Sequence, residues 1–126
     1  MNRTIIASLA LLATSFFTAN AQDIAAGEKV FKKCKACHTA TEAKNKIGPH
    51  LLGIVDRPAG SVEGFKYSKA MVAAAEGGLV WTAEDIADYV AKPTAKLKGT
   101  KMAFAGLKKE EDVSNLIAYL AAQETQ

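Results

Sequence analysis

The chain has 126 residues, of which 49% are hydrophobic, and it contains two cysteines and a formal net charge of +3. Because positive and negative charges nearly balance, we expect no polyanionic partner such as nucleic acid. A chain of this length folds as one small domain with a limited core. Two cysteines are too few for a framework of several disulfides. The sequence contains no internal repeat, low-complexity tract or linker that would divide it.

Residues 1–21 have the three regions of a secretory signal peptide. Arg3 supplies the positive start, residues 5–17 form an apolar run, and Ala19-Asn20-Ala21 matches the small-x-small pattern of a cleavage site. The apolar run is too short to span a bilayer comfortably, so we expect no stable membrane insertion. We predict cleavage after Ala21 and export of residues 22–126 as a single domain. Loss of Arg3 lowers the formal charge from +3 to +2.

Helical periodicity dominates the exported part of the chain, and almost no strand pattern is present. The first predicted helix runs from Ile24 with Asp23 as its N-cap. Its C-terminal end carries the two cysteines. The residues that share its apolar face are Gly27, Val30, Phe31 and Cys34.

The most informative motif in the chain follows this face. Cys34-Lys35-Ala36-Cys37-His38 fits C-x-x-C-H, the spacing at which two thiols attach to one haem. The adjacent histidine is then held where its imidazole can bind the iron. Other interpretations of Cys34 and Cys37 are a redox disulfide, which would follow a strand rather than a helix, or half of a zinc site. A closed zinc site would also need His38 and the distant His50 in unusual geometry.

Three further helices are predicted in the second half of the chain. Ser68 caps a short helix through Ala75, which Gly77-Gly78 ends. Thr82 and Asp85 form a capping box for the next helix, and Pro93 stops it. The last helix has acidic residues in its first turn and a clear apolar stripe. These are Glu110, Glu111 and Asp112 in the turn, and Val113, Leu116, Ile117 and Leu120 in the stripe.

The residue on the other side of the iron decides the chemistry, because an open position permits oxygen or gas binding whereas methionine closes it. The candidates are Met71, Met102 and His50. Met71 lies in an alanine-rich helical stretch, where methionine usually fills the core. Met102 lies in a segment, residues 93–107, that is poor in regular structure and can wrap around a ring. Spacing favours Met102 and leaves the others open.

The motifs together resemble the class I c-type cytochromes, specifically the short bacterial proteins that are similar to mitochondrial cytochrome c. The resemblance runs from Gly27 to Leu120. It rests on Gly27 with Phe31, on residues 34–38, Gly48-Pro49-His50-Leu51, Arg57, 64–67, Trp81, Tyr89, 99–106 and 116–120. The family implies an all-α fold, a small helical domain wrapped around one covalently bound haem c, with the terminal helices crossing near it.

The resemblance also implies a role for each matching residue. Cys34 and Cys37 correspond to the thioether attachments, and His38 and Met102 to the two axial ligands of the iron. Pro49 would accept a hydrogen bond from His38 and fix its imidazole plane. Further residues would compensate a buried haem propionate or steady the distal methionine and its loop. They are Arg57, Tyr67 and Trp81 for the propionate, and Tyr89 and Thr100 for the methionine loop.

The chain departs from the family pattern in places. His50 stands where the family commonly has asparagine, Lys92 replaces a frequent asparagine, and Lys98 stands where a proline often precedes the methionine loop. Losing that proline should leave the loop less restrained. It also adds a third amine to Lys96 and Lys101, any of which could displace Met102 at high pH.

A closed, six-coordinate haem implies a one-electron carrier in the periplasm rather than an enzyme. The alternative is a haem enzyme, or a gas or redox sensor, with a labile Met102. We expect a monomer whose partners are redox proteins with acidic docking surfaces, such as a membrane bc1-type complex, a terminal oxidase or another reductase. Lysines near the haem motif and on the methionine loop support that expectation. They are Lys32, Lys33, Lys35, Lys92, Lys96, Lys98 and Lys101.

Overall fold

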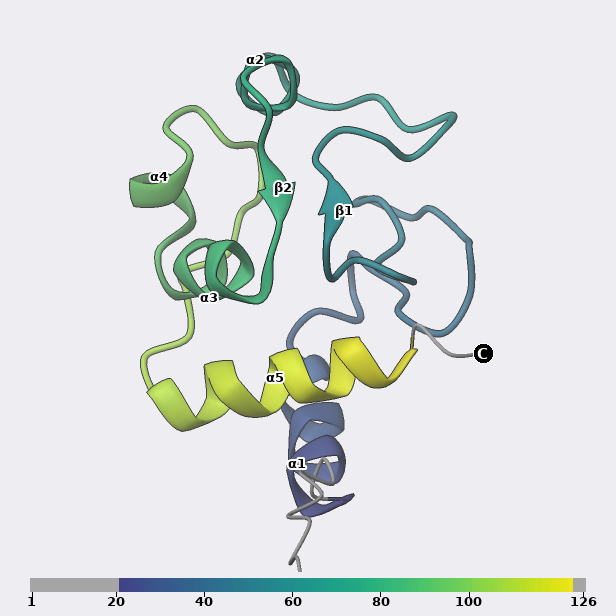
Figure 1. Cartoon of the computed structure of the whole chain (residues 1–126), viewed down its shortest axis with the longest axis vertical. Helices are drawn as coiled ribbons and strands as arrows, with labels where there is room; N and C mark the ends of the chain where they lie inside the picture. The colour runs from purple at the N-terminus through teal and green to yellow at the C-terminus, as the bar shows by residue number, and fades with distance from the viewer. Residues whose placement is uncertain (1–20, 124–126) are drawn as a thin grey trace, which may run out of the picture.

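The computed structural model describes residues 21–123 (Figure 1). The predicted signal peptide therefore lies outside the described residues, apart from Ala21. Helices in this range are joined by long irregular segments, and none of them is long and apolar enough to cross a membrane. The helices are α1 (Ala21–Phe31), α2 (Lys69–Glu76), α3 (Ala83–Ala91), α4 (Pro93–Lys96) and α5 (Glu110–Ala122), and the two short strands are β1 (Arg57–Pro58) and β2 (Val80–Trp81).

Helices α1 and α5 cross each other at one end of the molecule (Figure 1). Gly27 sits at the crossing, where a Cβ would lie 1.9 Å from the carbonyl oxygen of Asn115. The rings of Phe31 and Tyr119 pack beside it with centroids 5.3 Å apart. Leu116 of α5 is only 1% exposed and belongs to the buried core. The predicted helix crossing is confirmed, and it requires a residue without a side chain at position 27.

The predicted helix signals are confirmed for α2, α3 and α5. The Ser68 hydroxyl accepts a hydrogen bond from the backbone N–H of Met71 at 3.1 Å, and Gly77 ends α2. Thr82 caps α3 by accepting from the N–H of Asp85, also at 3.1 Å. Satisfying these otherwise unpaired N–H groups fixes where each helix begins. Helix α5 begins at Glu110 with its acidic first turn, as predicted.

Three boundaries differ from the sequence-based expectation. Helix α1 was expected to carry the two cysteines at its C-terminal end, but it ends at Phe31, and the cysteines lie on the turns that follow. Asp23 was expected to cap the first helix, but α1 already includes Ala21, and Asp23 lies in its first turn. A carboxylate is favourable in either place, because both lie at the positive end of the helix dipole. Pro93 does stop α3, but it also starts α4, a single turn inside a segment expected to be irregular. Proline suits this first helical position, where its missing N–H is not needed.

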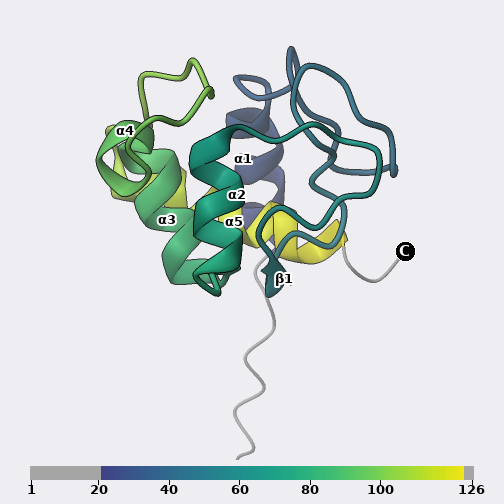
Figure 2. The ribbon, with the colours of Figure 1, turned by 90° about the horizontal axis from the view of Figure 1, so that it is seen from above.

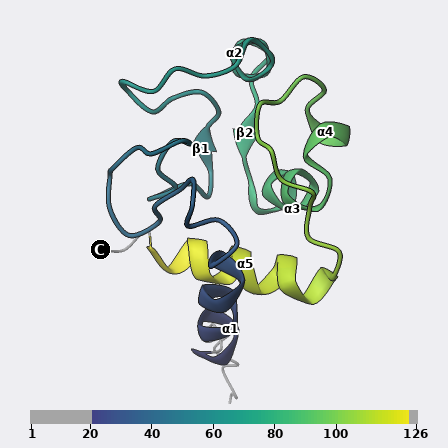
Figure 3. The ribbon, with the colours of Figure 1, turned by 180° about the vertical axis from the view of Figure 1, so that it is seen from behind.

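The two short strands β1 and β2 form an antiparallel pair in the middle of the chain. Arg57 of β1 lies opposite Trp81 of β2, and Pro58 lies opposite Val80. The N–H of Asp56 donates to the carbonyl of Trp81 at 2.7 Å next to this pair. Figure 3 shows β1, which belongs to the long segment 39–68, side by side with β2, which leads into α3. The pairing brings two of the predicted site residues together, although 24 positions separate them in the sequence.

Two irregular segments, residues 39–68 and 97–109, lie on either side of α2 in the view from above (Figure 2). The second segment is attached to α3 at its far end, where the N–H of Leu107 donates to the carbonyl of Val90 at 2.8 Å. The buried core runs between these segments and the α1–α5 crossing. Its members are Val30, Phe31, Ala40, Ile54, Ala59, Trp81, Ile86, Leu107, Leu116, Tyr119 and Leu120.

Candidate cofactor site

One cavity of about 360 Å³ collects residues from nearly every element of the fold. Apolar side chains from α1, the long segment 39–68 and α5 form much of its wall, including Phe31, Leu51, Ile54 and Leu116. All ten residues to which the family resemblance assigns a role also line it. They are Cys34, Cys37, His38, Pro49, Arg57, Tyr67, Trp81, Tyr89, Thr100 and Met102.

The C-x-x-C-H motif lies on hydrogen-bonded turns directly after α1. The N–H groups of Cys37 and His38 both donate to the carbonyl of Cys34, at 3.1 and 2.9 Å. This compact geometry turns both thiols and the imidazole toward the cavity. The burial of Cys34 raises its pKa to about 11, with a smaller contribution from Cys37, so this thiol is protonated at neutral pH. The two cysteines are free thiols, and no disulfide joins them.

Two neighbours hold His38 in a defined orientation. Its Nδ1 lies 2.7 Å from the carbonyl oxygen of Pro49, which can only accept, so Nδ1 carries the proton. Nε2 is therefore left with a lone pair. Burial lowers the pKa of His38, outweighing the opposing effect of the Pro49 hydrogen bond, and this favours the neutral, metal-binding form of the imidazole. Gly48 lies against the ring, where a Cβ would be 2.3 Å from Cε1.

Met102 lies in the segment after α4, beside a hydrogen-bonded pair from two elements. The hydroxyls of Tyr89 and Thr100 are 2.5 Å apart, and the Thr100 oxygen also accepts from the N–H of Met102 at 3.3 Å. Trp81 packs on Tyr89 with ring centroids 5.0 Å apart. Burial raises the pKa of Tyr89, so its hydroxyl keeps its proton and remains available as a donor. These contacts hold the backbone that leads into Met102.

Arg57 and Tyr67 provide a polar corner in the otherwise apolar wall. One terminal nitrogen of Arg57 donates to the carbonyls of His50 and Leu52, at 3.1 and 3.2 Å. Its Nε is buried and has no partner among the described residues. The Tyr67 hydroxyl accepts from the N–H of Val62 at 3.0 Å, which leaves its proton free to donate. A buried cation with an unused donor and a nearby hydroxyl proton fit a carboxylate.

The donor set therefore fits a haem. The cavity offers a large apolar wall, two thiols, a neutral imidazole with a free Nε2, a thioether and a polar corner suited to a propionate. It does not fit a closed zinc site, which needs four N or S ligands. Across residues 21–123, no group of three or more His, Cys, Asp and Glu side chains is placed to hold a metal.

The two other candidates for the distal ligand have different positions. Met71, on α2, lines the same cavity as Met102, so the structure leaves it as a competitor. His50 does not line the cavity, although it is the residue next to Pro49. Its backbone N–H donates to the Asn45 side chain at 3.0 Å, and its Nδ1 is buried without a partner among the described residues.

Sequence reasoning missed some residues of the wall. Ile47 is 78% exposed yet borders the cavity, so it forms part of the mouth. An apolar residue between Lys46 and Gly48 in a polar segment was the only signal. Phe65 also lines the cavity and packs edge-on against Tyr67 with centroids 4.9 Å apart. Phe65 belongs to the motif 64–67 that supported the family resemblance, but no role was assigned to it, and Ile47 was not singled out at all.

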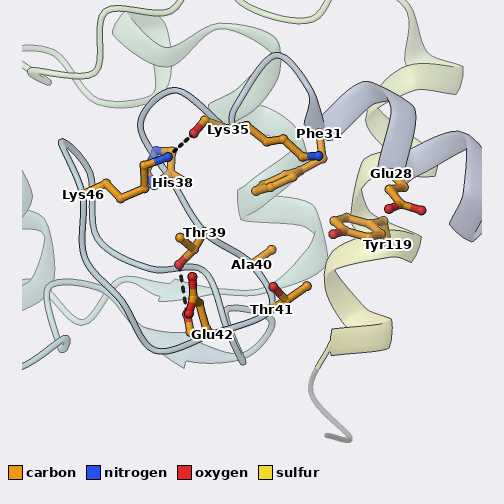
Figure 4. Close-up of a pocket in the computed structure, with 10 residues that line it drawn as sticks. All are labelled: Glu28, Phe31, Lys35, His38, Thr39, Ala40, Thr41, Glu42, Lys46 and Tyr119. Carbon is orange, nitrogen blue, oxygen red and sulfur yellow. Dashed lines mark hydrogen bonds between the residues drawn. The ribbon is translucent and has the colours of Figure 1, made fainter.

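A second, more polar hollow of about 360 Å³ lies beside the first and shares Phe31 and His38 with it (Figure 4). Here the Lys46 ammonium donates to the carbonyl of Lys35 at 2.5 Å, and the Thr39 hydroxyl donates to the carbonyl of Glu42 at 2.9 Å. These bonds tie the segment after the motif back onto it. The hollow contains none of the other nine predicted residues.

Known proteins share this arrangement of sequence and fold. The family model for cytochrome c matches residues 24–124. The chain is 48% identical over 119 residues to cytochrome c2 of Blastochloris viridis, which covers 94% of this chain and 91% of the relative. It is 48% identical over 100 residues to cytochrome c-550 of Nitrobacter winogradskyi, with coverage of 79% and 89%. The solved structure of cytochrome c2 from Rhodospirillum centenum matches with a TM-score of 0.76 at 42% identity, covering 81% of this chain and 98% of that one.

These similarities confirm the expected family, the all-α fold and the haem c cofactor. They also agree with the expectation that the protein carries electrons and is not an enzyme, because cytochromes c2 are electron carriers. The chain belongs to the cytochrome c family, as a class I bacterial c-type cytochrome with covalently bound haem c.

Proposed function

We propose that the protein is a periplasmic one-electron carrier in which His38 and Met102 are the axial ligands and Cys34 and Cys37 form the thioethers. The observation that supports this most directly is the convergence of these four side chains on one apolar cavity. When bound, haem c supplies a one-electron ferric/ferrous couple. The ferric visible spectrum tests the ligand pair, because a far-red charge-transfer band from methionine to iron is present only with Met102 or another thioether bound.

The chain's own residues prepare the site for a carrier. Pro49 holds His38 in one tautomer and one plane, in which Nε2 would be free to bind the iron. The cation of Arg57 and the free proton of Tyr67 lower the cost of burying a carboxylate. The apolar wall keeps water away and favours the less charged ferrous state. Because both axial positions are filled in this proposal, substrates have no open site on the iron.

We predict that Cys34→Ser and Cys37→Ser each reduce the yield of mature holoprotein to a small fraction of that of wild type. No other cysteine can replace either one. The yield of the variants is measured as haem-containing protein relative to wild type. For wild type, mass spectrometry under denaturing conditions should show one haem retained on a chain that starts at Gln22. The same spectrum tests export and cleavage after Ala21. Loss of haem from denatured wild type, or normal holoprotein from both variants, would contradict the two-thioether proposal.

We also propose that its redox partners dock on the side of the molecule where the cavity opens. Three lysines line the cavity, namely Lys33, Lys66 and Lys101, and the exposed Ile47 stands at its mouth. None of the acidic residues in the first turn of α5, Glu110, Glu111 and Asp112, lines the cavity. Lys35, which was grouped with Lys33 and Lys101 from the sequence, instead lines the neighbouring hollow. Such a charge distribution favours brief encounters with acidic surfaces, through interfaces that are small and wet.

We predict that Lys33→Glu and Lys101→Glu each slow the bimolecular electron-transfer rate with a membrane oxidase or reductase fraction, by about tenfold at low salt. Lys44→Glu is the matched control, because Lys44 is exposed and does not line the cavity. The difference should shrink as salt rises, since screening shortens the reach of charge to about 8 Å at physiological ionic strength. Stopped-flow measurement of the electron-transfer rate of each variant as a function of ionic strength tests this. Equal effects at all three positions would favour hydrophobic docking instead.

A further inference from the structure

Helix α3 contacts the methionine-bearing segment, residues 97–107, at two places, and it makes a third contact with α4 just before that segment. We call this segment the distal loop. At its far end, Leu107 donates its N–H to Val90, and Gly106 lies so close to α3 that a Cβ would be 2.1 Å from the carbonyl oxygen of Ala91. In its middle, Tyr89 and Thr100 share a hydrogen bond. The third contact is made just before the loop begins.

That third contact is an ion pair between α4 and α3. The Lys96 ammonium lies 2.5 Å from Oδ1 of Asp85 and 3.6 Å from Oδ2 of Asp88. The second oxygen of Asp85 accepts from the Thr82 hydroxyl at 2.7 Å, so the N-cap of α3 orients the carboxylate. The side chains of Lys96 and Asp85 are only 24% and 30% exposed, whereas Asp88 is 61% exposed. Asp85 is therefore the principal partner, and the Thr82 hydroxyl orients its carboxylate through the oxygen that Lys96 does not contact.

The backbone between the two helices makes this contact possible. Lys92 leaves the helical conformation, with φ −147° and ψ 82°, and serves both as the C-cap of α3 and as the N-cap of α4. The N–H groups of Ala95 and Lys96 then return to its carbonyl, at 3.2 and 3.0 Å. The chain folds back, so that residue 96 reaches residue 85, and the two short helices lie next to each other in Figure 1.

The distal loop has little restraint of its own. Its internal backbone bonds are few, among them those from Thr100 to Leu97 at 3.1 Å and from Phe104 to Met102 at 3.0 Å. Gly99 adopts a positive φ of 88°. Position 98 is a lysine and not the proline that is frequent in the family, so no ring restricts its φ. Without the contacts to α3, the segment would gain conformational freedom and would lose few hydrogen bonds of its own.

We propose that Lys96 is a positioning residue, whose ion pair with Asp85 fixes the start of the distal loop and limits the motions that carry Met102 out of the cavity. The part that concerns Met102 rests on its proposed role as the distal ligand. The bond to Asp85 also raises the pKa of Lys96, so this amine stays protonated. Because Asp85 binds its ammonium, Lys96 is the least available of the three amines that were expected to compete for the iron at high pH.

Two measurements on the ferric holoprotein test this. The first is imidazole binding, which requires the distal loop to open. The second is hydrogen exchange at the Thr100 and Leu107 amides, which reports opening without reference to the iron. Lys96→Gln and Asp85→Asn should each increase the apparent imidazole affinity, and lower the protection of these amides, by about two- to fivefold. Lys96→Arg should keep imidazole affinity and amide protection close to those of wild type. Asp88→Asn should change both less than Asp85→Asn does.

Lys98→Gln is the matched control, because it removes the same charge from an exposed position two residues away that pairs with no carboxylate in the described part of the chain. We expect it to leave both readouts unchanged. Equal effects of Lys96→Gln and Lys98→Gln would assign the result to net charge and overturn the proposal. So would an effect of Lys96→Gln on α5 amides alone, since that indicates a contribution to global stability and none to the loop.

The two proposals fail separately. If Met102→Ala binds imidazole no more tightly than wild type does, then Met102 is not the residue displaced, and the proposed ligand is wrong. The exchange of the Thr100 and Leu107 amides still decides whether Lys96 holds the loop. If Met102→Ala opens the iron but Lys96→Gln behaves as wild type in both measurements, the ligand stands and the positioning role of Lys96 is wrong.

Discussion

Met102→Ala should abolish the far-red charge-transfer band of the ferric protein and lower the reduction potential by on the order of 0.1 V or more. Methionine is a soft, neutral ligand that favours ferrous iron, so its loss favours the ferric state. The variant should also bind cyanide and, when reduced, carbon monoxide, because alanine cannot fill the sixth position. Visible spectroscopy and potentiometric titration measure these changes. We expect the fold to persist, since Met102 is only half-buried and the distal loop keeps its contacts to α3.

Two further variants make this test specific. Met71→Leu is the necessary control, because Met71 lines the same cavity and the change nearly conserves volume. We expect it to keep the band and the potential. His50→Ala should also keep both, since His50 does not line the cavity. Loss of the sixth ligand in His50→Ala would mean a bis-histidine iron, and loss in Met71→Leu would mean that the wrong methionine was chosen.

The features that could be predicted from the sequence are those fixed by neighbouring residues. Ser68 and Thr82 cap helices because their hydroxyls reach an N–H three positions on, which spacing alone reveals. The C-x-x-C-H motif is equally local, since one turn of backbone presents both thiols and the imidazole. The boundary at Asp23 was wrong because an acidic residue is favourable both as a cap and in the first turn.

The features that could not be predicted depend on distant parts of the chain. No local pattern places Arg57 opposite Trp81, and only the resemblance to a family suggested that they share a site. The ion pair of Lys96 with Asp85 depends on the backbone of Lys92, a position where the sequence shows only a departure from the family pattern. Among lysines of similar type, spacing cannot show which one has a fixed partner, as Lys96 does, and which is solvated, as Lys98 is.

The α1–α5 crossing should be the most sensitive structural position in the protein. Gly27→Ala should destabilise the holoprotein by about 3 kcal/mol or more, at the upper end of what overpacking costs. The added Cβ would lie 1.9 Å from the carbonyl oxygen of Asn115 and 2.7 Å from Cβ of Tyr119. Neither atom is the far end of a flexible side chain. The helices must therefore separate, which also disturbs Phe31 and Leu116 in the cavity wall.

Denaturant unfolding of the holoprotein, followed by circular dichroism, measures this effect. Gly77→Ala is the matched control, because Gly77 is in the right-handed region at φ −74° and its nearest contact to an added Cβ is 3.4 Å. We expect that change to be neutral or slightly stabilising, since it restricts the unfolded chain without a clash. A loss of stability at position 27 no larger than that at position 77 would mean that the two helices adapt to the side chain. The close approach would then not be what selects glycine at the crossing.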